Sequence, residues 1–531
     1  MQIVRIGDGS TKRHSAETVG GKAANLAHMA SLGLPVPPAF VLPVKLCAAV
    51  VAGDGQAMHH VSEGLREGIA FLEQATGRKF GDRRRPLLVS VRSGAARSMP
   101  GMLDTVTDVG CTLTAVHGLV RASGNPRFAW DCRRRFLESY GHVVLGLDGE
   151  VLAGRLAQIV ATEHVASEPM LDAEAMERLA RAQLQAIEDE GETVCDDAFD
   201  QLENAAHAVY RSWTSARAQT YRKLQHLDDL QGTAVTVQAM VFGNGGADSG
   251  AGVAFSRDPS TGDAGPVIEV LFGAQGEDIV SGNRTPETQS AIERRLPAVA
   301  AQLRETLGRL EREFAEVQDV EFTIERGKLW MLQTRVAKRT PLAALRFAMD
   351  FVREGLITPQ QGLHRLEGIA LDKIARQRLA DVAAPAAHGT AAAAGIAVGR
   401  VAFDSKSAER MAAGGEPVIL VRRDTSTADV AGFAVSAGIV TAVGGRTAHA
   451  ALVARQMGKP SVVGCAALAV DPAGRGVKLA GSPLKEGDWL SIDGEAGQIY
   501  RGRGKVVVER PEAELAEVAR WQDATRKHSA A

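Results

Sequence analysis

The stretch Thr441–Cys465 has the sequence TAVGGRTAHAALVARQMGKPSVVGC and decides the fold of the C-terminal part of the chain. An apolar strand leads into Gly444 and Gly445, and a helix is expected to begin near Thr447, whose hydroxyl can cap it. His449 then lies in the first helical turn, beside unpaired backbone N–H groups and the positive end of the helix dipole. Because this environment disfavours a protonated imidazole and favours a phosphoryl group, His449 is predicted to act as a nucleophile that accepts one.

The residues around His449 support this chemistry but leave an alternative open. The two glycines let the backbone approach a phosphate closely, and Arg446 and Arg455 can pair with its charge. The same spacing also suits a helix-capping turn in which the histidine has no chemical role. Other histidines, such as His142 and His207, have no comparable surroundings and are interpreted as structural or surface residues.

Short apolar runs on either side of this stretch predict a small separate domain. Residues 417–421 (PVILV) and 438–441 (GIVT) are expected to be buried strands, with alanine-rich helices between and after them. This alternation predicts an α/β layer over residues 396–505. Residues 383–395 (AAPAAHGTAAAAG) have no bulky side chain to anchor a core and are predicted to be a linker, with a short alanine-rich helix as the alternative. Residues 511–527 are expected to form a charged helix.

The first part of the chain, up to about residue 340, mixes helical patterns with short β-rich runs. Residues 319–324 and 328–333 predict a hairpin with Gly327 in its turn. The other expected elements are strands at residues 87–92 (LLVSVR) and 233–241 (TAVTVQAMV), a helix at residues 289–317 that is broken near Pro297, and an amphipathic helix at residues 341–357.

A loop of small residues follows the first of these strands. In SVRSGAARSMPGMLDT, residues 90–105, the loop after Arg92 can close over a polyphosphate, with the guanidinium as a bidentate donor. Gly20–Lys22 (GGK) opens a helix near the N-terminus and offers a second cation, although its spacing is not that of a Walker motif. Loops of this composition are common, so each motif alone leaves a purely structural role open.

The predicted hairpin carries two carboxylates on one face. Asp319 and Glu321 share that face because side chains alternate along a strand. Two such carboxylates repel each other unless a cation joins them, and Mg²⁺ that bridges nucleotide phosphates would do so. On the second strand, Gln333 accompanies Arg335, which can pair with a phosphate oxygen. A solvent-facing strand edge without a ligand is the alternative.

The composition is that of an ordinary globular protein. The chain has 531 residues, of which 45% are hydrophobic and 23% charged, and a formal net charge of −2, which favours neither nucleic acid nor a membrane as a partner. No apolar run is long enough for a membrane span, and the first residues do not resemble a secretory signal. The five scattered cysteines indicate neither a disulfide framework nor a zinc cluster. A cytoplasmic location is therefore expected.

Taken in order, the motifs resemble those of the pyruvate, phosphate dikinase family of phosphoenolpyruvate-utilising enzymes. The resemblance extends from about residue 5 to residue 505 and is carried by GGKAANLAHMASLGLPVPPAF, SVRSGAARSMPGMLDTV, GTAVTVQAMVFGN, GVAFSRDPSTG, AQGEDIVSGNRTPE, DVEF, LWMLQTR and GGRTAHAALVARQMGKPSVVGC. Shared in one order, these motifs outweigh the alternatives that each of them leaves open alone.

The resemblance implies an α+β multidomain fold. It comprises an ATP-grasp-like nucleotide-binding domain over residues 1–340, a helical linker region over residues 341–395, a small swivelling β/α phosphohistidine domain over residues 396–505, and a C-terminal helix or tail over residues 506–531.

The resemblance also assigns site residues. The positions that match the family's ATP site are Lys22, Arg92, Glu277, Asp278, Asp319, Glu321, Gln333 and Arg335, of which Asp319, Glu321 and Gln333 match its metal positions. His449 matches the phosphorylated histidine, and Thr447 matches a threonine that regulatory kinases modify in some members. Arg446 and Ala448 stand where the family usually has Met and Ser, and Gly273 stands where it typically has Asn.

For activity, the resemblance implies that ATP, with Mg²⁺ and inorganic phosphate, phosphorylates His449 and releases AMP and pyrophosphate. The resemblance does not extend to the family's third domain, a barrel that binds phosphoenolpyruvate and pyruvate. A separate acceptor-binding subunit is therefore expected to hold pyruvate or another acceptor. Two alternatives stay open: a non-catalytic nucleotide-binding regulator or scaffold of a full-length dikinase, and a kinase for a different small-molecule acceptor.

Overall fold

A computed structural model of the chain describes residues 3–97, 99, 101–281, 284–425, 429–446, 449–470 and 476–529. It confirms a mixed α/β chain. The chain divides into two compact units: unit 1 comprises Met1–Gly246 with Trp330–Thr334, and unit 2 comprises Ala247–Leu329 with Arg335–Ala531. This division cuts the predicted nucleotide-binding range after Gly246. The functional domain ranges and the ATP-grasp-like architecture therefore stay predictions.

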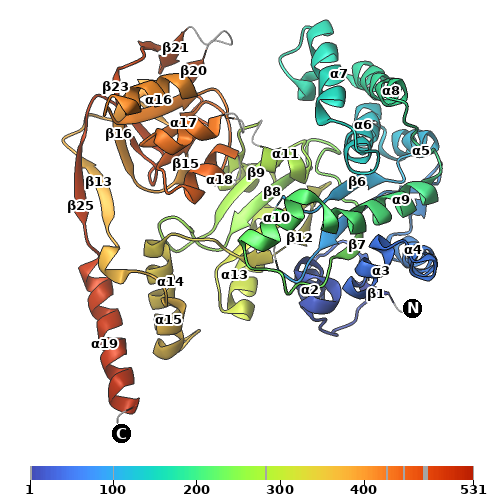
Figure 1. The fold of residues 1–531 in the computed structure, drawn as a ribbon, viewed down its shortest axis with the longest axis horizontal. Helices are drawn as coiled ribbons and strands as arrows, with labels where there is room; N and C mark the ends of the chain where they lie inside the picture. The colour runs from blue at the N-terminus through green and yellow to red at the C-terminus, as the bar shows by residue number, and fades with distance from the viewer. Residues whose placement is uncertain are drawn as a thin grey trace. The chain divides into compact units, whose positions relative to one another are not determined.

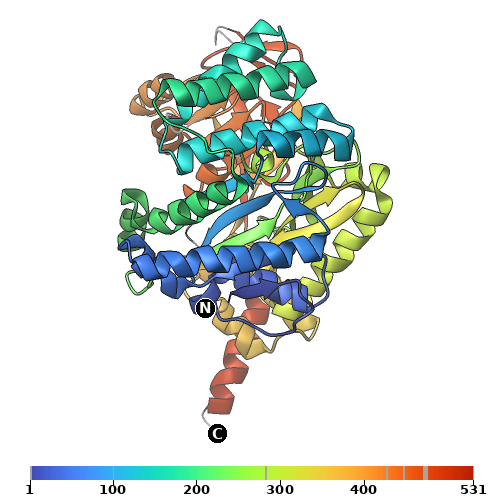
Figure 2. The same ribbon diagram turned by 90° about the vertical axis from the view of Figure 1, so that its right-hand side faces the viewer.

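Unit 1 is built around a five-stranded sheet in the order β1-β2-β7-β5-β6. Its strands are β1 (Val4–Ile6), β2 (Ala39–Leu42), β5 (Val89–Gly94), β6 (Thr105–Val109) and β7 (Ala234–Ala239). The strands predicted at residues 87–92 and 233–241 are confirmed as β5 and β7, which pair antiparallel. Figure 2 shows the long helix α4 (Gly55–Thr76) lying across the sheet, and a Cβ at Gly68 of this helix would lie only 2.4 Å from the ring of Phe40 on β2.

Apart from a two-stranded sheet of β3 (Lys79–Phe80) and β4 (Pro86–Leu87), the other elements of unit 1 are mainly helices (Figure 1). They are α1 (Ala16–Val19), α2 (Gly21–Ser31), α3 (Cys47–Val51), α5 (Leu113–Ser123), α6 (Pro126–Val143), α7 (Gly149–Thr162), α8 (Ala173–Asp189), α9 (Ala198–Arg211) and α10 (Ala216–Leu224). Helix α6 contains a buried charge cluster in which Asp131 accepts hydrogen bonds from Arg134 and Arg135. Burial alone would raise the pKa of Asp131, but these two guanidinium groups hold it below its usual range.

A second five-stranded sheet has the order β10-β9-β8-β11-β12 and belongs to unit 2 except for Trp330–Thr334 of β12, which count with unit 1. Its strands are β8 (Gly250–Phe255), β9 (Val267–Phe272), β10 (Glu287–Thr288), β11 (Gln318–Glu325) and β12 (Lys328–Val336). The predicted hairpin is confirmed as β11 and β12, with Gly327 at a φ of +71° in the turn. The predicted helix break is also confirmed, because α12 (Gln289–Arg295) ends before Pro297, the first residue of α13 (Pro297–Phe314).

The two faces of strand β11 differ in chemistry. Val320, Phe322 and Ile324 are buried on one face, and α13 contacts the strand. Asp319 and Glu321 lie on the opposite face, because side chains alternate along a strand. The carboxylates are therefore kept away from the apolar side of the sheet.

The register of the sheet places a third carboxylate on the same face. Glu321 of β11 is paired with Val253 of β8, and Val253 is paired with Glu269 of β9. Residues directly opposite each other on neighbouring strands share a face. Glu321 and Glu269 are therefore two strand spacings apart, or about 10 Å between backbones, on one face of the sheet.

The C-terminal domain of unit 2 contains an eight-stranded sheet in the order β14-β24-β23-β16-β17-β18-β19-β15. Its strands are β14 (Ala387–His388), β15 (Thr390–Ala393), β16 (Ile396–Ala402), β17 (Val418–Arg422), β18 (Gly438–Thr441), β19 (Ser461–Val463), β23 (Trp489–Asp493) and β24 (Gln498–Arg501). Strands β16 to β19 run parallel, and the helices that connect them are α16 (Ser405–Ala413), α17 (Val430–Val435) and α18 (His449–Gln456). A smaller sheet follows, formed by β20 (Leu468–Val470), β21 (Val477–Leu479) and β22 (Ser482–Leu484). The predicted α/β layer is confirmed.

The prediction of a linker at residues 383–395 is wrong. Ala387–His388 and Thr390–Ala393 form the two outermost strands of the eight-stranded sheet, where β14 pairs with β24 and β15 pairs with β19. Small residues are needed here because space is short: a Cβ at Gly389 would lie 2.7 Å from the carbonyl oxygen of Val463. The alanines are packing residues of a crowded sheet rather than parts of a flexible connection.

The remaining elements of unit 2 form a helical group and a two-stranded ribbon (Figure 1). The ribbon consists of β13 (Arg376–Ala380) and β25 (Lys505–Glu509), which pair antiparallel. The helices α14 (Pro341–Arg353), α15 (Pro359–Arg365) and α19 (Glu512–Ser529) share one apolar cluster. The helices predicted at residues 341–357 and 511–527 are confirmed as α14 and α19.

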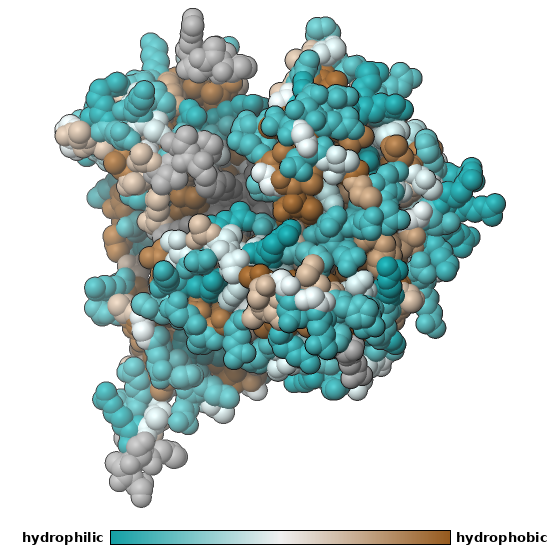
Figure 3. Space-filling view, turned by 45° about the vertical axis from the view of Figure 1, so that its right-hand side comes forward, coloured by the Kyte–Doolittle hydropathy of each residue, from teal (hydrophilic) through white to brown (hydrophobic). Residues whose placement is uncertain are grey.

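The hydropathy of the surface and of the helices bears on whether a helix could span a membrane. Hydrophilic side chains dominate the face in Figure 3, and apolar ones are scattered among them. Among the helices described, none combines the length and apolar character that crossing a bilayer requires. All five cysteines are free.

Replacement of Trp521 should loosen the helical group. The indole of Trp521 on α19 lies 3.0 Å from the position that a Cβ at Gly362 of α15 would take, and its side chain is buried. Trp521→Ala should lower the free energy of unfolding by about 3 kcal/mol, because it leaves a cavity. Hydrogen exchange should become faster in α15 and α19, whereas Arg520→Ala, at an exposed position of α19, should leave exchange unchanged. Equal exchange in α15 for both variants would contradict this packing.

Candidate functional site

Three predicted nucleotide-binding residues line one pocket of unit 1. Lys22 comes from the first turn of α2, Arg92 from β5, and Gln333 from the part of β12 that belongs to unit 1. The other lining residues are apolar or neutral hydrogen-bonding residues: Ala23, Leu26, Ser93, Thr236, Gln238 and Leu332. The enclosed space is only about 10 Å³, which is about the room that one water molecule needs. Two cations beside neutral donors nevertheless suit an anionic group such as a phosphate.

A close backbone contact holds Lys22 and Arg92 side by side. Gly20 precedes α2 with a φ of +82°, and a Cβ at this position would lie 2.1 Å from the carbonyl oxygen of Gly94 on β5. The N–H of Gly21 donates to the carbonyl of Ala95 at 2.9 Å. Only glycine permits both the positive φ and the contact. The GGK motif therefore works through the backbone, by bringing the start of α2 against the end of β5.

The carboxylates of β11 form a charged group with Arg335. Arg335 Nε lies 2.8 Å from Asp319 Oδ2, and the Asp319 side chain is only 11% exposed. Burial raises the pKa of Asp319, whereas Arg335 lowers it. Burial alone would lower the pKa of Arg335, but the charges of Asp319 and Glu321 raise it. The three groups therefore act on one another at short range, and the pairing of Arg335 with a phosphate oxygen stays a prediction.

Glu269 connects the stretch before His449 to the same sheet face. Its side chain is 5% exposed, and both carboxylate oxygens lie 3.0 Å from the backbone nitrogen of Arg446. Burial raises the pKa of Glu269, and the N–H of Arg446 lowers it. A Cβ at Gly445 would lie 2.6 Å from Pro286 and 3.0 Å from a carboxylate oxygen of Glu269, so the glycine permits this approach.

The two arginines named with His449 extend this contact. Arg446 Nη1 donates to Asp258 Oδ2 at 3.2 Å, and Arg455 Nη2 donates to the carbonyl oxygen of Arg446. Burial lowers the pKa of Arg455, whose charge also interacts with Glu269, Asp319 and Arg335. Arg455 therefore lies near the carboxylates of β9 and β11. That the two arginines pair with a phosphoryl group on His449 stays a prediction.

Helix α18 begins at His449, so the prediction that this residue lies in the first helical turn is confirmed. The strand that precedes it, β18, ends at Thr441, and Gly444 has a φ of +115°. Thr447, predicted both as the helix cap and as a regulatory position, and Ala448 lie outside the described residues. The catalytic role of His449 stays a prediction.

Glu277 and Asp278 lie in the short helix α11 (Gly276–Ser281). Asp278 has a local structural role, because its Oδ2 accepts the N–H of Gln275 at 2.8 Å. Gly273, one of the departures from the family pattern, has a φ of +61° with open space around it. Asn is one of the few other residues that tolerate this conformation. The nucleotide contacts predicted for Glu277 and Asp278 stay predictions.

The predicted metal residues supply oxygen donors. In the described ranges, no group of three His, Cys, Asp or Glu side chains is arranged as a preformed metal cage. Mg²⁺ does not require one, since it usually binds one or two carboxylates together with substrate phosphates and water. Asp319 and Glu321, side by side on β11, fit that requirement. Gln333 counts with unit 1 and the two carboxylates with unit 2, so the three-residue set stays a prediction.

Sequence reasoning missed Glu269 and Asp258. A signal for Glu269 was present, because it is the one charged residue in the apolar run VIEVLF, and a carboxylate in a buried strand needs a partner. Asp258, in the motif GVAFSRDPSTG, carried no such signal. Its acceptor role depends on Arg446, a residue 188 positions away in the sequence.

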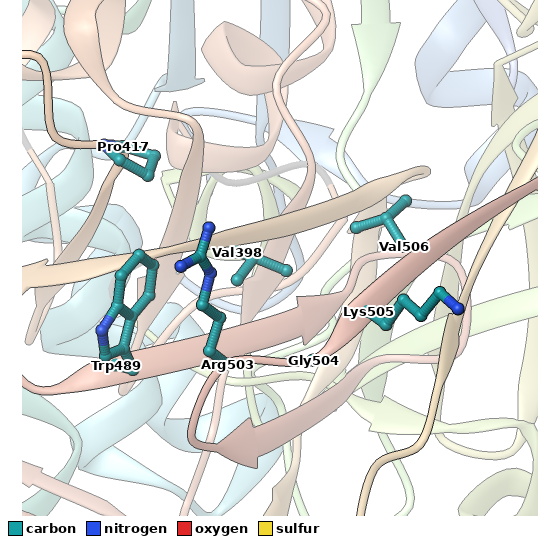
Figure 4. A pocket seen from close by; sticks show the side chains of 7 residues that line it. All are labelled: Val398, Pro417, Trp489, Arg503, Gly504, Lys505 and Val506. Carbon is teal, nitrogen blue, oxygen red and sulfur yellow. The ribbon is translucent and has the colours of Figure 1, made fainter.

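A second cavity, of about 460 Å³, lies in the C-terminal domain and contains none of the predicted site residues. Figure 4 shows its lining residues, which are Val398, Pro417, Trp489, Arg503, Gly504, Lys505 and Val506. The guanidinium of Arg503 lies 4.7 Å from the centre of the Trp489 ring, and that of Arg400 lies 4.6 Å from it.

Comparison with known families agrees with the geometry of both regions. Residues 56–302 match the family described as pyruvate phosphate dikinase, AMP/ATP-binding domain, and residues 414–497 match the family described as PEP-utilising enzyme, mobile domain. The chain therefore contains stretches homologous to both of these domains. It is homologous to proteins named pyruvate, phosphate dikinase, which are phosphotransferases.

Individual relatives support this homology over nearly the whole chain. A pyruvate, phosphate dikinase from Rhizobium meliloti (strain 1021) is 41% identical over 526 residues, which cover 96% of this chain and 59% of the relative. The enzyme of that name from Clostridium symbiosum is 41% identical, covering 91% of this chain and 56% of the relative. Pyruvate, phosphate dikinase 2 from Zea mays is 39% identical, covering 99% and 60%. The chain thus spans less than two thirds of the length of these relatives.

Replacement of Gly20 should damage the pocket of Lys22 and Arg92. Gly20→Ala should lower both the melting temperature and the affinity for ATP, because its Cβ would collide with the backbone of Gly94. Gly33→Ala is a matched control, since Gly33 also has a positive φ, of +74°, but has open space around it. Gly33→Ala should lower the stability by only about 1–2 kcal/mol, which is what a positive φ costs a residue with a Cβ. Its affinity for ATP should stay unchanged. Equal ATP affinities by calorimetric titration would contradict the proposed role of the contact.

Proposed function

We propose that this chain is an ATP-dependent phosphotransferase that forms a phosphohistidine at His449. In the proposed reaction the bond between the α- and β-phosphates of ATP breaks and AMP leaves. The γ-phosphoryl group passes to inorganic phosphate and leaves as pyrophosphate. The β-phosphoryl group stays on the imidazole of His449, which loses its ring proton. A covalent intermediate divides one difficult transfer into two easier steps.

One observation carries this proposal. The backbone N–H of Arg446, three residues before His449, is bound by Glu269, and Glu269 lies on the sheet face that carries Asp319 and Glu321. A helix-capping turn without chemical function has no need for a buried carboxylate from a distant strand. The contact supports a state in which the start of α18 lies beside the carboxylates proposed to bind a nucleotide with its metal.

The proposed roles follow from charge and position. Lys22 and Arg92 neutralise phosphate oxygens, and Gln333 beside them offers neutral hydrogen bonds. Arg335, held by Asp319, stays in reach of a phosphate oxygen because its side chain is 49% exposed. Arg455 lowers the negative charge near Glu269 and Asp319, which favours approach of an anionic group.

We further propose that Asp319 and Glu321, with Gln333, hold Mg²⁺. When bound, the ion would neutralise charge on the phosphates during transfer. The carboxylates of Asp319 and Glu321 repel each other, which favours a cation between them. Arg335 neutralises part of the charge of these carboxylates through its ion pair with Asp319.

The second half of the reaction is proposed to take place elsewhere. The phosphoryl group on His449 would pass to pyruvate, or to another acceptor, held by a separate subunit. The support for pyruvate is homology to pyruvate, phosphate dikinases, of which the chain spans 56–60% of the length in the three relatives described. Transfer between two sites requires movement of the domain that carries His449.

Labelled ATP tests the phosphohistidine directly. With ATP labelled on the β-phosphate, Mg²⁺ and phosphate, the wild-type chain should incorporate close to one acid-labile, base-stable label per chain. His449→Asn should incorporate none. His388→Asn is the control, because His388 is an exposed histidine of the same domain. Absence of label on the wild-type chain, or label that survives in His449→Asn, would refute the proposal.

The metal assignment predicts a specific change in Mg²⁺ dependence. Glu321→Gln should raise the Mg²⁺ concentration needed for half-maximal labelling by at least about tenfold, since even loss of an outer-shell partner costs that much. Glu305→Gln, at an exposed position of α13, should leave it unchanged. A Glu321→Gln variant with the wild-type Mg²⁺ dependence would exclude Glu321 as a ligand.

A further inference from the structure

The side chain of Arg446 donates to the carboxylate of Asp258, which the turn after β8 already holds in place. Arg446 Nη1 lies 3.2 Å from Asp258 Oδ2, and the two side chains are only 13% and 15% exposed. The other oxygen of Asp258, Oδ1, accepts the N–H groups of Ser260 and Thr261 at 2.8 and 3.2 Å. The turn after β8 therefore orients the carboxylate before Arg446 arrives, so little side-chain entropy is lost at Asp258.

Arg446 is bound at three points. Its N–H is bound by Glu269, its guanidinium by Asp258, and its carbonyl oxygen by Arg455. Arg455 belongs to α18, the helix that begins at His449. The position of Arg446 is therefore coupled directly to the start of that helix.

Only the guanidinium contact depends on which residue stands at position 446. Any residue except proline would offer its N–H to Glu269 and its carbonyl to Arg455. The methionine that the pyruvate, phosphate dikinase pattern usually has here could not donate to Asp258. The ion pair is thus an addition to the backbone contact, and one that this chain makes with its own side chains.

We propose that the Arg446–Asp258 ion pair stabilises the docked arrangement of the C-terminal domain on the β8–β9 region, so that Arg446 is a positioning residue for phosphorylation of His449. The reaction in this statement rests on the function proposed above, whereas the docking does not. Because both side chains are largely shielded from water, salt screens the pair less than an open surface pair. Breaking it leaves a shielded charge without its partner, which favours separation of the two surfaces.

The test measures docking and chemistry separately. Spin labels at Gln302→Cys on α13 and Glu409→Cys on α16, both exposed positions, report the distance between the two regions in a Cys195→Ser background. The other four cysteines are buried. Distance distributions from pulsed electron paramagnetic resonance are compared for the parent, Arg446→Met, Asp258→Asn and the double variant. Asp258→Asn keeps an Oδ1 acceptor for the turn but replaces Oδ2 with a donor.

Each single substitution should reduce the ratio of docked to undocked molecules by about tenfold, the order expected for a hydrogen bond between charged groups. The double variant should have a ratio of docked to undocked molecules no lower than that of either single variant, because both substitutions remove the same interaction. Single-turnover labelling of His449 should slow by a similar factor. Arg410→Met, which breaks the 2.6 Å pair of Arg410 with Glu486 inside the C-terminal domain, should change neither measurement.

The outcomes separate this inference from the proposed function. An unchanged distance distribution in Arg446→Met and Asp258→Asn would overturn it, and so would slower labelling without a change in distance. Additive effects in the double variant would overturn it too. If the distances change as expected but the parent chain forms no phosphohistidine, the docking role stands and the proposed function fails.

Discussion

A carboxylate buried in an apolar strand is the constraint on which the arrangement of unit 2 depends. Glu269 is 5% exposed, and an ionised carboxylate at such a position costs several kcal/mol unless hydrogen bonds and opposite charges compensate for it. The N–H of Arg446 supplies the hydrogen bond, and the charges of Arg446 and Arg455 favour the ionised form. The stretch before His449 thus compensates for the buried charge of Glu269, and Glu269 in turn holds that stretch in place. A domain that moves away must leave Glu269 to water or to another partner, which gives the docked arrangement a definite energetic basis.

Each of the two units carries charge of a kind that one part of a metal–nucleotide complex needs. The cations Lys22 and Arg92 gather in the pocket of unit 1, where the glycine contact of α2 with β5 sets their spacing. The carboxylates Asp319 and Glu321 gather on one face of the second sheet. A nucleotide with its metal presents both kinds of charge, anionic phosphates and a divalent cation, and therefore needs both kinds of partner. The docking proposed for Arg446 would add the nucleophile to this set.

Local patterns predicted most elements but not the contacts between them. The helix break near Pro297 could be predicted because proline is tolerated only in the first turn of a helix. The hairpin turn could be predicted because glycine readily adopts the positive φ that Gly327 has there. The prediction of a linker at residues 383–395 was wrong because the small size of these side chains does not reveal that they lie in a crowded sheet. Of the site, Lys22 and Arg92 could be brought together by motif, whereas the bond of Glu269 with Arg446 spans 177 residues and has no local signature. Long-range pairs of this kind become visible only once the register of the sheet is known.

The function proposed above is a reversible phosphoryl transfer between ATP and His449. Exchange of radiolabelled AMP into ATP tests it most directly, because exchange requires both binding of the nucleotide and formation of the phosphoenzyme, and requires no acceptor. We expect exchange by the isolated chain that depends on Mg²⁺, phosphate and pyrophosphate, that needs no pyruvate, and that disappears in His449→Asn. Absence of exchange under these conditions, or exchange that persists without His449, would contradict it.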